Sequence, residues 1–143
     1  MGRPEEEETD FVGNRAKVLA IGGGVIGGLI GMTHGYFETQ QSGAPGGILI
    51  NAIGSGCTGF SQTTLNCLPA MTLLPDLYYS GIVTIIIGLV IIGWTATRIR
   101  TRRGPLVLGL LSLVLLVVGG GFLPPLLGFV AAGAGTRAKA MGV

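Results

Sequence analysis

Three glycines near the N-terminus have the spacing of a dinucleotide-binding loop. Gly22, Gly24 and Gly27 follow an apolar run and fit the G-x-G-x-x-G pattern, in which glycine lets a pyrophosphate approach a helix N-terminus. That fingerprint also needs alternating strands and helices, and an acidic residue about 20 positions further on. Ser42 stands at that distance, in a stretch rich in glycine, proline and serine. The sequence therefore predicts neither a nucleotide site nor any other cofactor.

The two cysteines, Cys57 and Cys67, could form a redox centre or a structural disulfide. Redox pairs usually have the C-x-x-C spacing, which tunes the thiolate, and these cysteines lack both that spacing and a nearby basic residue. In an extracytoplasmic loop a disulfide is the simpler prediction. Closing so small a loop would stabilise the fold by about 2.5 to 3 kcal/mol in the chain-entropy model.

His34 is the single histidine of the chain and could in principle bind haem or a metal. A second ligand would have to come from another copy of the chain, or as a carboxylate from Glu38 or Asp76. We expect instead a partly solvated histidine at a membrane surface, and no metal site. Because no residue set has catalytic spacing, we also predict no catalytic residue and no enzymatic activity.

The composition is that of a membrane protein. Charged residues make up 11% of the 143 residues, hydrophobic residues make up 48%, and 27 residues are glycine; soluble proteins average about 25% charged residues. The length suits one domain. A net charge of +2 is too small to indicate a nucleic-acid partner, so we expect membrane lipids as the surroundings.

Two apolar segments, residues 18–37 and 77–97, are each about as long as the 20 residues that a helix needs to cross a bilayer. In the second segment Tyr78 and Tyr79 stand near one end and Trp94 near the other. Aromatic rings of this kind prefer the membrane interfaces. Both segments are therefore predicted to be transmembrane helices.

A third apolar block continues to residue 135 and is interrupted by Pro124 and Pro125. A single helix of this length would exceed the hydrocarbon core and carry two prolines in its interior. We therefore predict a hairpin of two short spans, 105–120 and 123–136. The resulting fold class is an all-α integral membrane protein, a small polytopic bundle with four transmembrane helices; three helices are the alternative.

Basic residues occur in three short segments, and cytoplasmic segments are typically enriched in them. With four spans, all three segments and both termini lie in the cytoplasm, and residues 38–76 form an external loop that the disulfide would pin. Residues 1–14 are predicted to be a disordered acidic tail, 15–139 a single membrane domain, and 140–143 a C-terminal tail. The central basic group could serve as a topology signal or bind lipid headgroups. It consists of Arg98, Arg100, Arg102 and Arg103.

Small residues recur at helical spacing in the first two spans. Four glycines follow each other at intervals of four in the first span, and three small residues do so in the second. Such rows let two helix backbones approach closely, within one chain or between copies. The predicted packing residues are Gly23, Gly27, Gly31, Gly35, Ser80, Thr84 and Gly88.

These patterns favour a non-enzymatic structural or accessory subunit, which packs through its glycine-rich faces against itself or other membrane subunits. A small multimeric channel or transporter is the alternative, although the middle of the last three spans has no ionisable residue, the usual marker of an ion pathway. An extracytoplasmic thiol-disulfide redox protein that uses Cys57 and Cys67 is the second alternative.

Overall fold

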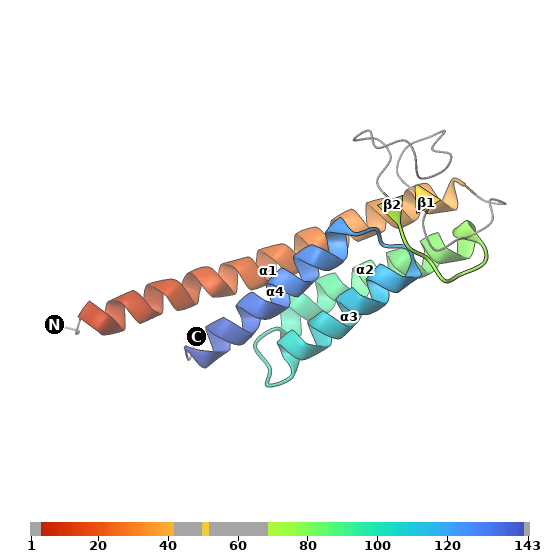
Figure 1. Ribbon diagram of the computed structural model, residues 1–143. Coiled ribbons are helices and arrows are strands. Elements are labelled where there is room, and N and C mark those ends of the chain that lie inside the picture. The colour runs from red at the N-terminus through yellow and green to blue at the C-terminus, as the bar shows by residue number, and fades with distance from the viewer. Residues whose placement is uncertain (1–3, 42–49, 52–68, 142–143) are drawn as a thin grey trace.

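The computed structural model of the chain describes residues 4–41, 50–51 and 69–141. Four helices make up most of these residues (Figure 1). They are α1 (Pro4–Thr39), α2 (Leu77–Arg98), α3 (Gly104–Val118) and α4 (Leu123–Ala140). Two strands of two residues each, β1 (Ile50–Asn51) and β2 (Pro69–Ala70), pair antiparallel with Ile50 opposite Ala70.

Helix α1 begins at Pro4, so residues 4–14 of the predicted N-terminal tail are helical in the described part of the chain. Proline is favoured at the first position of a helix, and glutamates in the first turn interact favourably with the helix dipole. The run from Glu5 to Glu8 follows this rule. Arg15 stacks its guanidinium 4.1 Å from the centre of the Phe11 ring, one turn away. Local helix preference thus prevails over repulsion between the like charges.

The other helices begin and end near the predicted boundaries, and local signals explain why. The Asp76 carboxylate caps α2 by accepting a hydrogen bond of 2.7 Å from the Tyr78 backbone N–H. Pro105 stands in the first turn of α3, where the absence of an N–H group costs nothing. Gly119 ends α3 with a φ of 118°, a conformation that favours glycine.

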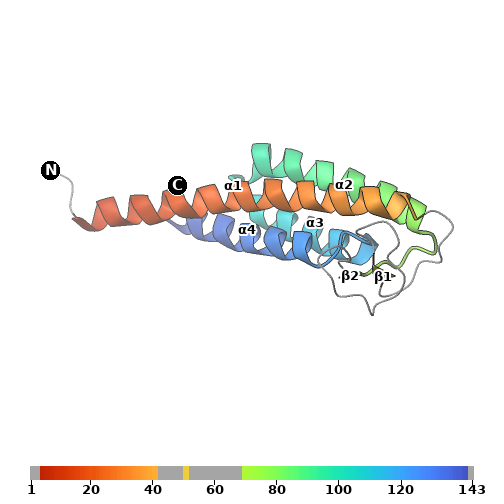
Figure 2. The same cartoon turned by 90° about the horizontal axis from the view of Figure 1, so that it is seen from above.

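The four helices form a ring in which each contacts the next, and α4 closes the ring against α1. Figures 1 and 2 show that both termini and the α2–α3 connection lie at one end of the bundle. We call this the basic end, because it carries Arg15, Lys17 and the arginines of residues 98–103. The strands and the α3–α4 turn, residues 119–122, lie at the opposite end, which we call the loop end.

Many large apolar side chains point outward from the bundle, whereas several small or polar side chains are buried inside it. Ile86, Leu126 and Val130 are 54%, 58% and 63% exposed. The interior contains a modest cluster with Ile91, Leu108, Leu115 and Ala131, together with the buried hydroxyls of Ser80, Thr84, Thr95 and Ser112. A water-soluble bundle would instead present polar and charged residues on its outer face.

Two helical segments, Phe11–Thr39 and Leu77–Arg98, are long and apolar enough to cross a membrane, and Gly104–Val118 is a shorter apolar helix. The helical part of the predicted fold class is therefore confirmed. Within the predicted external loop, α1 continues to Thr39 and residues 69–76 are described. Cys57, Cys67 and the disulfide predicted between them lie outside the described residues.

Candidate functional site

Buried polar side chains from separate parts of the chain meet at the loop end. Two come from α1, one from the segment after β2, and two from the first turns of α2, and each is at most 2% exposed. Polar groups are rarely enclosed in this way unless they bond one another or a ligand. We call this set the polar cluster: His34, Glu38, Thr72, Ser80 and Thr84.

The hydroxyl group of Ser80 joins two members of the polar cluster, Glu38 and Thr72, to the end of α3. Its Oγ lies 2.9 Å from Glu38 Oε2 and 2.9 Å from Thr72 Oγ1, and it also contacts the Val118 carbonyl oxygen. A serine hydroxyl has one proton and can donate to one of these three acceptors at a time. The three possible acceptors of that proton belong to α1, to the end of α3 and to the segment after β2.

The Val118 carbonyl group is available because α3 ends there. The last carbonyls of a helix have no partner within the helix, and this one accepts hydrogen bonds from Thr72 Oγ1 at 3.2 Å and Thr84 Oγ1 at 3.3 Å. The backbone N–H of Leu73 donates to the Val117 carbonyl oxygen at 3.1 Å. The segment after β2 is thereby fixed across the end of α3.

Glu38 brings a carboxyl group into this enclosed site. Oε2 accepts from Ser80, whereas Oε1 has no hydrogen-bond partner among the described residues. A side chain at Gly119 would collide with Oε1, so the glycine at the end of α3 makes room for the carboxyl group. Burying a carboxyl group with incomplete hydrogen bonding is costly, which marks Glu38 as a functional candidate.

His34 lies one helical turn before Glu38 and is 1% exposed, which corrects the expectation of a partly solvated histidine. Its ring packs against Gly121, where an added Cβ would lie 3.1 Å from the imidazole Cε1. Gly121 has a φ of 74°, in the left-handed region that favours glycine. The Nε2 atom has no hydrogen-bond partner among residues 4–41, 50–51 and 69–141.

The polar cluster supports binding and proton sharing more readily than nucleophilic catalysis. Ser80 bonds a carboxyl group, a hydroxyl and a carbonyl, so no described contact gives it the imidazole base that activates a serine. In the described part of the chain no three His, Cys, Asp or Glu residues gather as a metal-binding group. Asp76, a possible ligand in the sequence, caps α2 instead.

The glycine row predicted for α1 is divided among three neighbouring helices. Gly23 and Gly27 face α4, Gly31 faces side chains of both α3 and α4, and Gly35 faces α2. An added Cβ at Gly27 would lie 3.0 Å from the Pro124 carbonyl oxygen, and one at Gly35 would lie 2.7 Å from a carbonyl oxygen of α2. These contacts join backbone to backbone, so larger side chains would separate the helices.

The row predicted for α2 has two different roles. Gly88 faces the Gly28 carbonyl oxygen, which would lie 2.8 Å from an added Cβ. Ser80 and Thr84 instead turn their hydroxyls into the polar cluster. Their small size predicts helix packing for all three, whereas the structure also uses the hydroxyls of Ser80 and Thr84.

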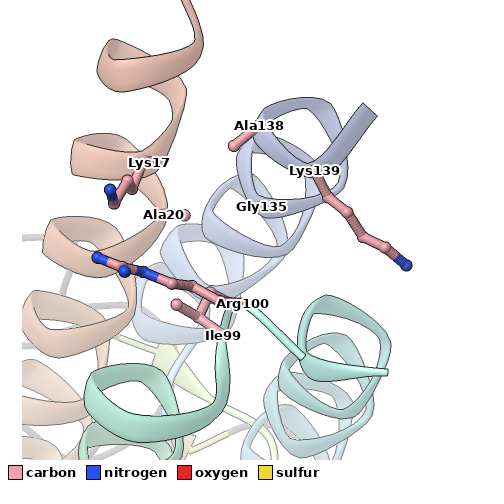
Figure 3. A pocket seen from close by; sticks show the side chains of 7 residues that line it. All are labelled: Lys17, Ala20, Ile99, Arg100, Gly135, Ala138 and Lys139. Atoms are coloured by element: carbon pink, nitrogen blue, oxygen red, sulfur yellow. The ribbon is translucent and has the colours of Figure 1, made fainter. Parts of the chain in front are cut away.

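The four arginines predicted to lie at the membrane surface are exposed at the basic end. Figure 3 shows a small pocket there, lined by Lys17 and Arg100 among others. Lys139 donates a hydrogen bond of 3.1 Å to the Arg102 carbonyl oxygen and so connects α4 with the α2–α3 turn. Positive charge from three separate segments is thus gathered at one end.

Sequence reasoning missed Glu38 and Thr72 as site residues. The predicted external loop begins at Glu38, but α1 continues to Thr39, and the spacing of four residues puts Glu38 and His34 on one face of that helix. Ser80 and Thr84 are also four residues apart, so α2 has a polar face that could have been predicted to meet the polar face of α1. No sequence spacing indicates Thr72, because its place in the site depends on a bridge to Val118 at the end of α3.

Comparison with known proteins gives no relative: no family model, curated protein or solved structure matches the chain.

Proposed function

We propose that the chain is an integral membrane protein in which all four helices enter the bilayer, and that it acts as a non-enzymatic accessory subunit. The observation that carries the membrane assignment is the outward exposure of large apolar side chains on every helix, with polar side chains inside. Water would penalise this surface, whereas lipid would not. Helices α3 and α4, at about 22 and 27 Å, are short enough to need local thinning of the bilayer.

The arrangement of charge supports an orientation with both termini in the cytoplasm. Basic residues of the α1 N-terminal half, the α2–α3 turn and the α4 C-terminus lie at one end, and such residues favour the cytoplasmic side. The loop end would then face outward, carrying the polar cluster near the external surface. The basic end would meet the anionic headgroups of the inner leaflet.

The accessory role is supported by the difference between the glycine faces, which pack inside the bundle, and the large apolar faces, which are exposed. The glycine rows of α1 are occupied by contacts within the chain, so a partner subunit would dock on the outer apolar faces. Leu106 and Leu110 of α3 and Leu89 and Val90 of α2 provide such faces. We therefore expect intramolecular packing through glycine and intermolecular packing through leucine, isoleucine and valine.

Membrane topology can be tested by labelling with membrane-impermeant thiol reagents. In a background with Cys57 and Cys67 replaced by serine, single cysteines are placed at Arg102, at Lys139 and at Thr72. We expect labelling of the first two from the cytoplasmic side of inverted vesicles. The cysteine at position 72 should be labelled only from the external side, and only when the bundle partly opens, because Thr72 is buried. Release of the wild-type protein from membranes by alkaline carbonate would contradict the membrane assignment.

The accessory role can be tested by purification in mild detergent with identification of whatever co-migrates. We expect a defined complex larger than one chain, and Leu110→Ala combined with Leu106→Ala should release the chain from it. The matched control is Leu108→Ala, a buried position on the same helix, which should destabilise the bundle itself. A single chain in every mild detergent would contradict the accessory role.

The buried carboxyl group favours a second candidate, a small channel or transporter for protons or cations. An ionisable group inside a membrane protein is a functional candidate by default, and Glu38 Oε1 has no hydrogen-bond partner in the described part of the chain. Proteoliposomes should then show proton or sodium flux that Glu38→Gln abolishes. Thr33→Val, on an exposed face of the same helix, is the matched control. Equal flux in empty liposomes and proteoliposomes would exclude this candidate.

The redox alternative depends on Cys57 and Cys67, which lie outside the described residues, and it stays a prediction. A double serine variant that retains full function would remove it.

A further inference from the structure

A groove of about 390 Å³ runs between α1 and α4 near the basic end. The two helices contact each other and run in opposite directions, as Figures 1 and 2 show. Each supplies four lining residues at positions i, i+3, i+4 and i+7, so the groove follows one face of each helix. The lining includes Arg15 and Leu19 of α1, and Val130, Gly133 and Arg137 of α4.

The groove is apolar toward the middle of the bundle and cationic toward the basic end. Leu19 and Val130 are 61% and 63% exposed, so the groove is open to the surroundings of the bundle. Arg137 stands in the last turn of α4, and Arg15 lies one turn nearer the basic end than Leu19. A molecule that fits the whole groove therefore has an apolar body and a negatively charged head.

The guanidinium group of Arg15 is held in position for such a head. Its central carbon lies 4.1 Å from the centre of the Phe11 ring, one helical turn closer to the basic end. Stacking on an aromatic face leaves the N–H groups at the edge of the guanidinium plane available to donate hydrogen bonds. Arg15 and Arg137 are both exposed, so both guanidinium groups are accessible to an anion at this end of the groove.

We propose that this groove binds one anionic glycerophospholipid. The phosphate oxygens accept hydrogen bonds from Arg15 and Arg137, and one acyl chain lies over Gly133 between Leu19 and Val130. A guanidinium group can donate two parallel hydrogen bonds to a phosphate, which makes arginine well suited to this head. The absence of a side chain at Gly133 leaves open space, where a chain of methylene groups can lie against the helix. Lipid binding of this kind rests on the membrane assignment proposed above, but on neither the accessory role nor ion transport.

The charges around the groove favour an anionic lipid over a zwitterionic one. None of its described lining residues is acidic. The acidic run Glu5–Glu8 ends seven residues before Arg15, which places it about 10 Å or more away along the helix axis. A second groove of about 400 Å³, between α3 and α4, is lined by Arg102 and Lys139, but the Lys139 ammonium group already donates to the Arg102 carbonyl oxygen. The α1–α4 groove is therefore the better site for a phosphate.

The proposal can be tested by native mass spectrometry of the wild-type chain released from a neutral detergent. Phosphatidylglycerol should bind with saturation at one molecule per chain. Phosphatidylcholine with the same acyl chains should bind at least about tenfold more weakly, because two arginines repel its choline cation. Glycerol phosphate, which has the head without the tails, should not compete at the same concentration. Equal binding of the two lipids would overturn the proposal, and so would competition by glycerol phosphate, which would indicate a phosphate site without a lipid. Carbonate extraction tests the membrane assignment separately, so a negative lipid result would leave that assignment standing.

Paired variants test whether this groove holds the lipid. Arg15→Gln combined with Arg137→Gln should raise the dissociation constant for phosphatidylglycerol at least about tenfold, because both phosphate donors are lost. Arg102→Gln combined with Lys139→Gln is the matched control, since it removes the same charge from the other groove, and it should bind as the wild type does. Equal weakening in both pairs would indicate general attraction to surface charge and refute the proposed site.

The apolar part of the groove can be tested in the same way. Gly133→Leu should fill the open space and weaken phosphatidylglycerol binding to a similar degree while leaving the bundle folded, because an added Cβ meets no other part of the bundle within 4 Å. Gly93→Leu, at an exposed position on α2 with the same open space, is the control and should bind as the wild type does. Unchanged affinity in Gly133→Leu would place the lipid elsewhere and contradict the proposal.

Discussion

At the loop end His34 and Glu38 are enclosed by the bundle, whereas at the basic end Arg98, Arg100 and Arg102 extend into the surroundings. The enclosed groups are fixed by hydroxyls and by glycines that make room for them. The exposed groups make few fixed contacts, such as the hydrogen bond of Lys139 to the α2–α3 turn. Polar groups therefore bind the helices to one another at the loop end, and we propose that they orient the chain in the membrane at the basic end.

The largest expected effect comes from Gly81→Leu near the loop end. An added Cβ would collide with the Gly35 carbonyl oxygen and lie 2.7 Å from the Thr39 side chain, so α1 and α2 would have to separate. We expect a loss of about 3 kcal/mol in the free energy of unfolding, measured by circular dichroism during titration with sodium dodecyl sulfate. Gly93→Leu, on the same helix nearer the basic end with open space around it, should be neutral or slightly stabilising.

A smaller loss is expected when the polar cluster loses its shared hydroxyl. Ser80→Ala leaves Glu38 Oε2 without this donor, and an unsatisfied buried acceptor costs about 1 to 3 kcal/mol. Thr97→Ala is the matched change toward the basic end, because its hydroxyl bonds a backbone carbonyl on an exposed surface. Equal losses in the same unfolding measurement would show that the two ends do not differ.

Removing positive charge at the basic end should alter orientation and not stability. Replacing the four arginines of residues 98–103 with glutamine is expected to change the unfolding free energy by less than about 0.5 kcal/mol, since they are exposed. The fraction of chains inserted in the opposite orientation should rise. Cysteine labelling at the C-terminus measures that fraction, and an unchanged orientation would contradict the topological role of the arginines.

The smallest effect is expected for Lys139→Met, which removes the hydrogen bond to the Arg102 carbonyl oxygen. Exposed contacts of this kind contribute roughly 0 to 1 kcal/mol. We expect a change of about 0.3 kcal/mol or less in the same unfolding titration. A loss above about 1.5 kcal/mol would show that the basic end is fixed as firmly as the loop end.

The sequence allowed the positions of the helices to be predicted because their signals are local. Apolar length and the proline pair at the start of α4 are each signals within one segment of the chain. The polar cluster could not be predicted, because it depends on which faces of separate helices meet. The helix from Pro4 differs from the predicted tail for another reason, because glutamates are favourable at a helix N-terminus even when they are neighbours in the sequence.

The closure of the ring by α1 and α4 has a consequence for synthesis of the chain. Gly23 and Gly27 of α1 pack against Leu127 and Ala131 of α4, about a hundred residues later in the sequence. At about 5 to 20 residues per second, the partner of α1 emerges from the ribosome some 5 to 20 seconds after α1 itself. During that interval the glycine face of the first helix has no α4 to cover it and is open to contact with α2 or with another chain.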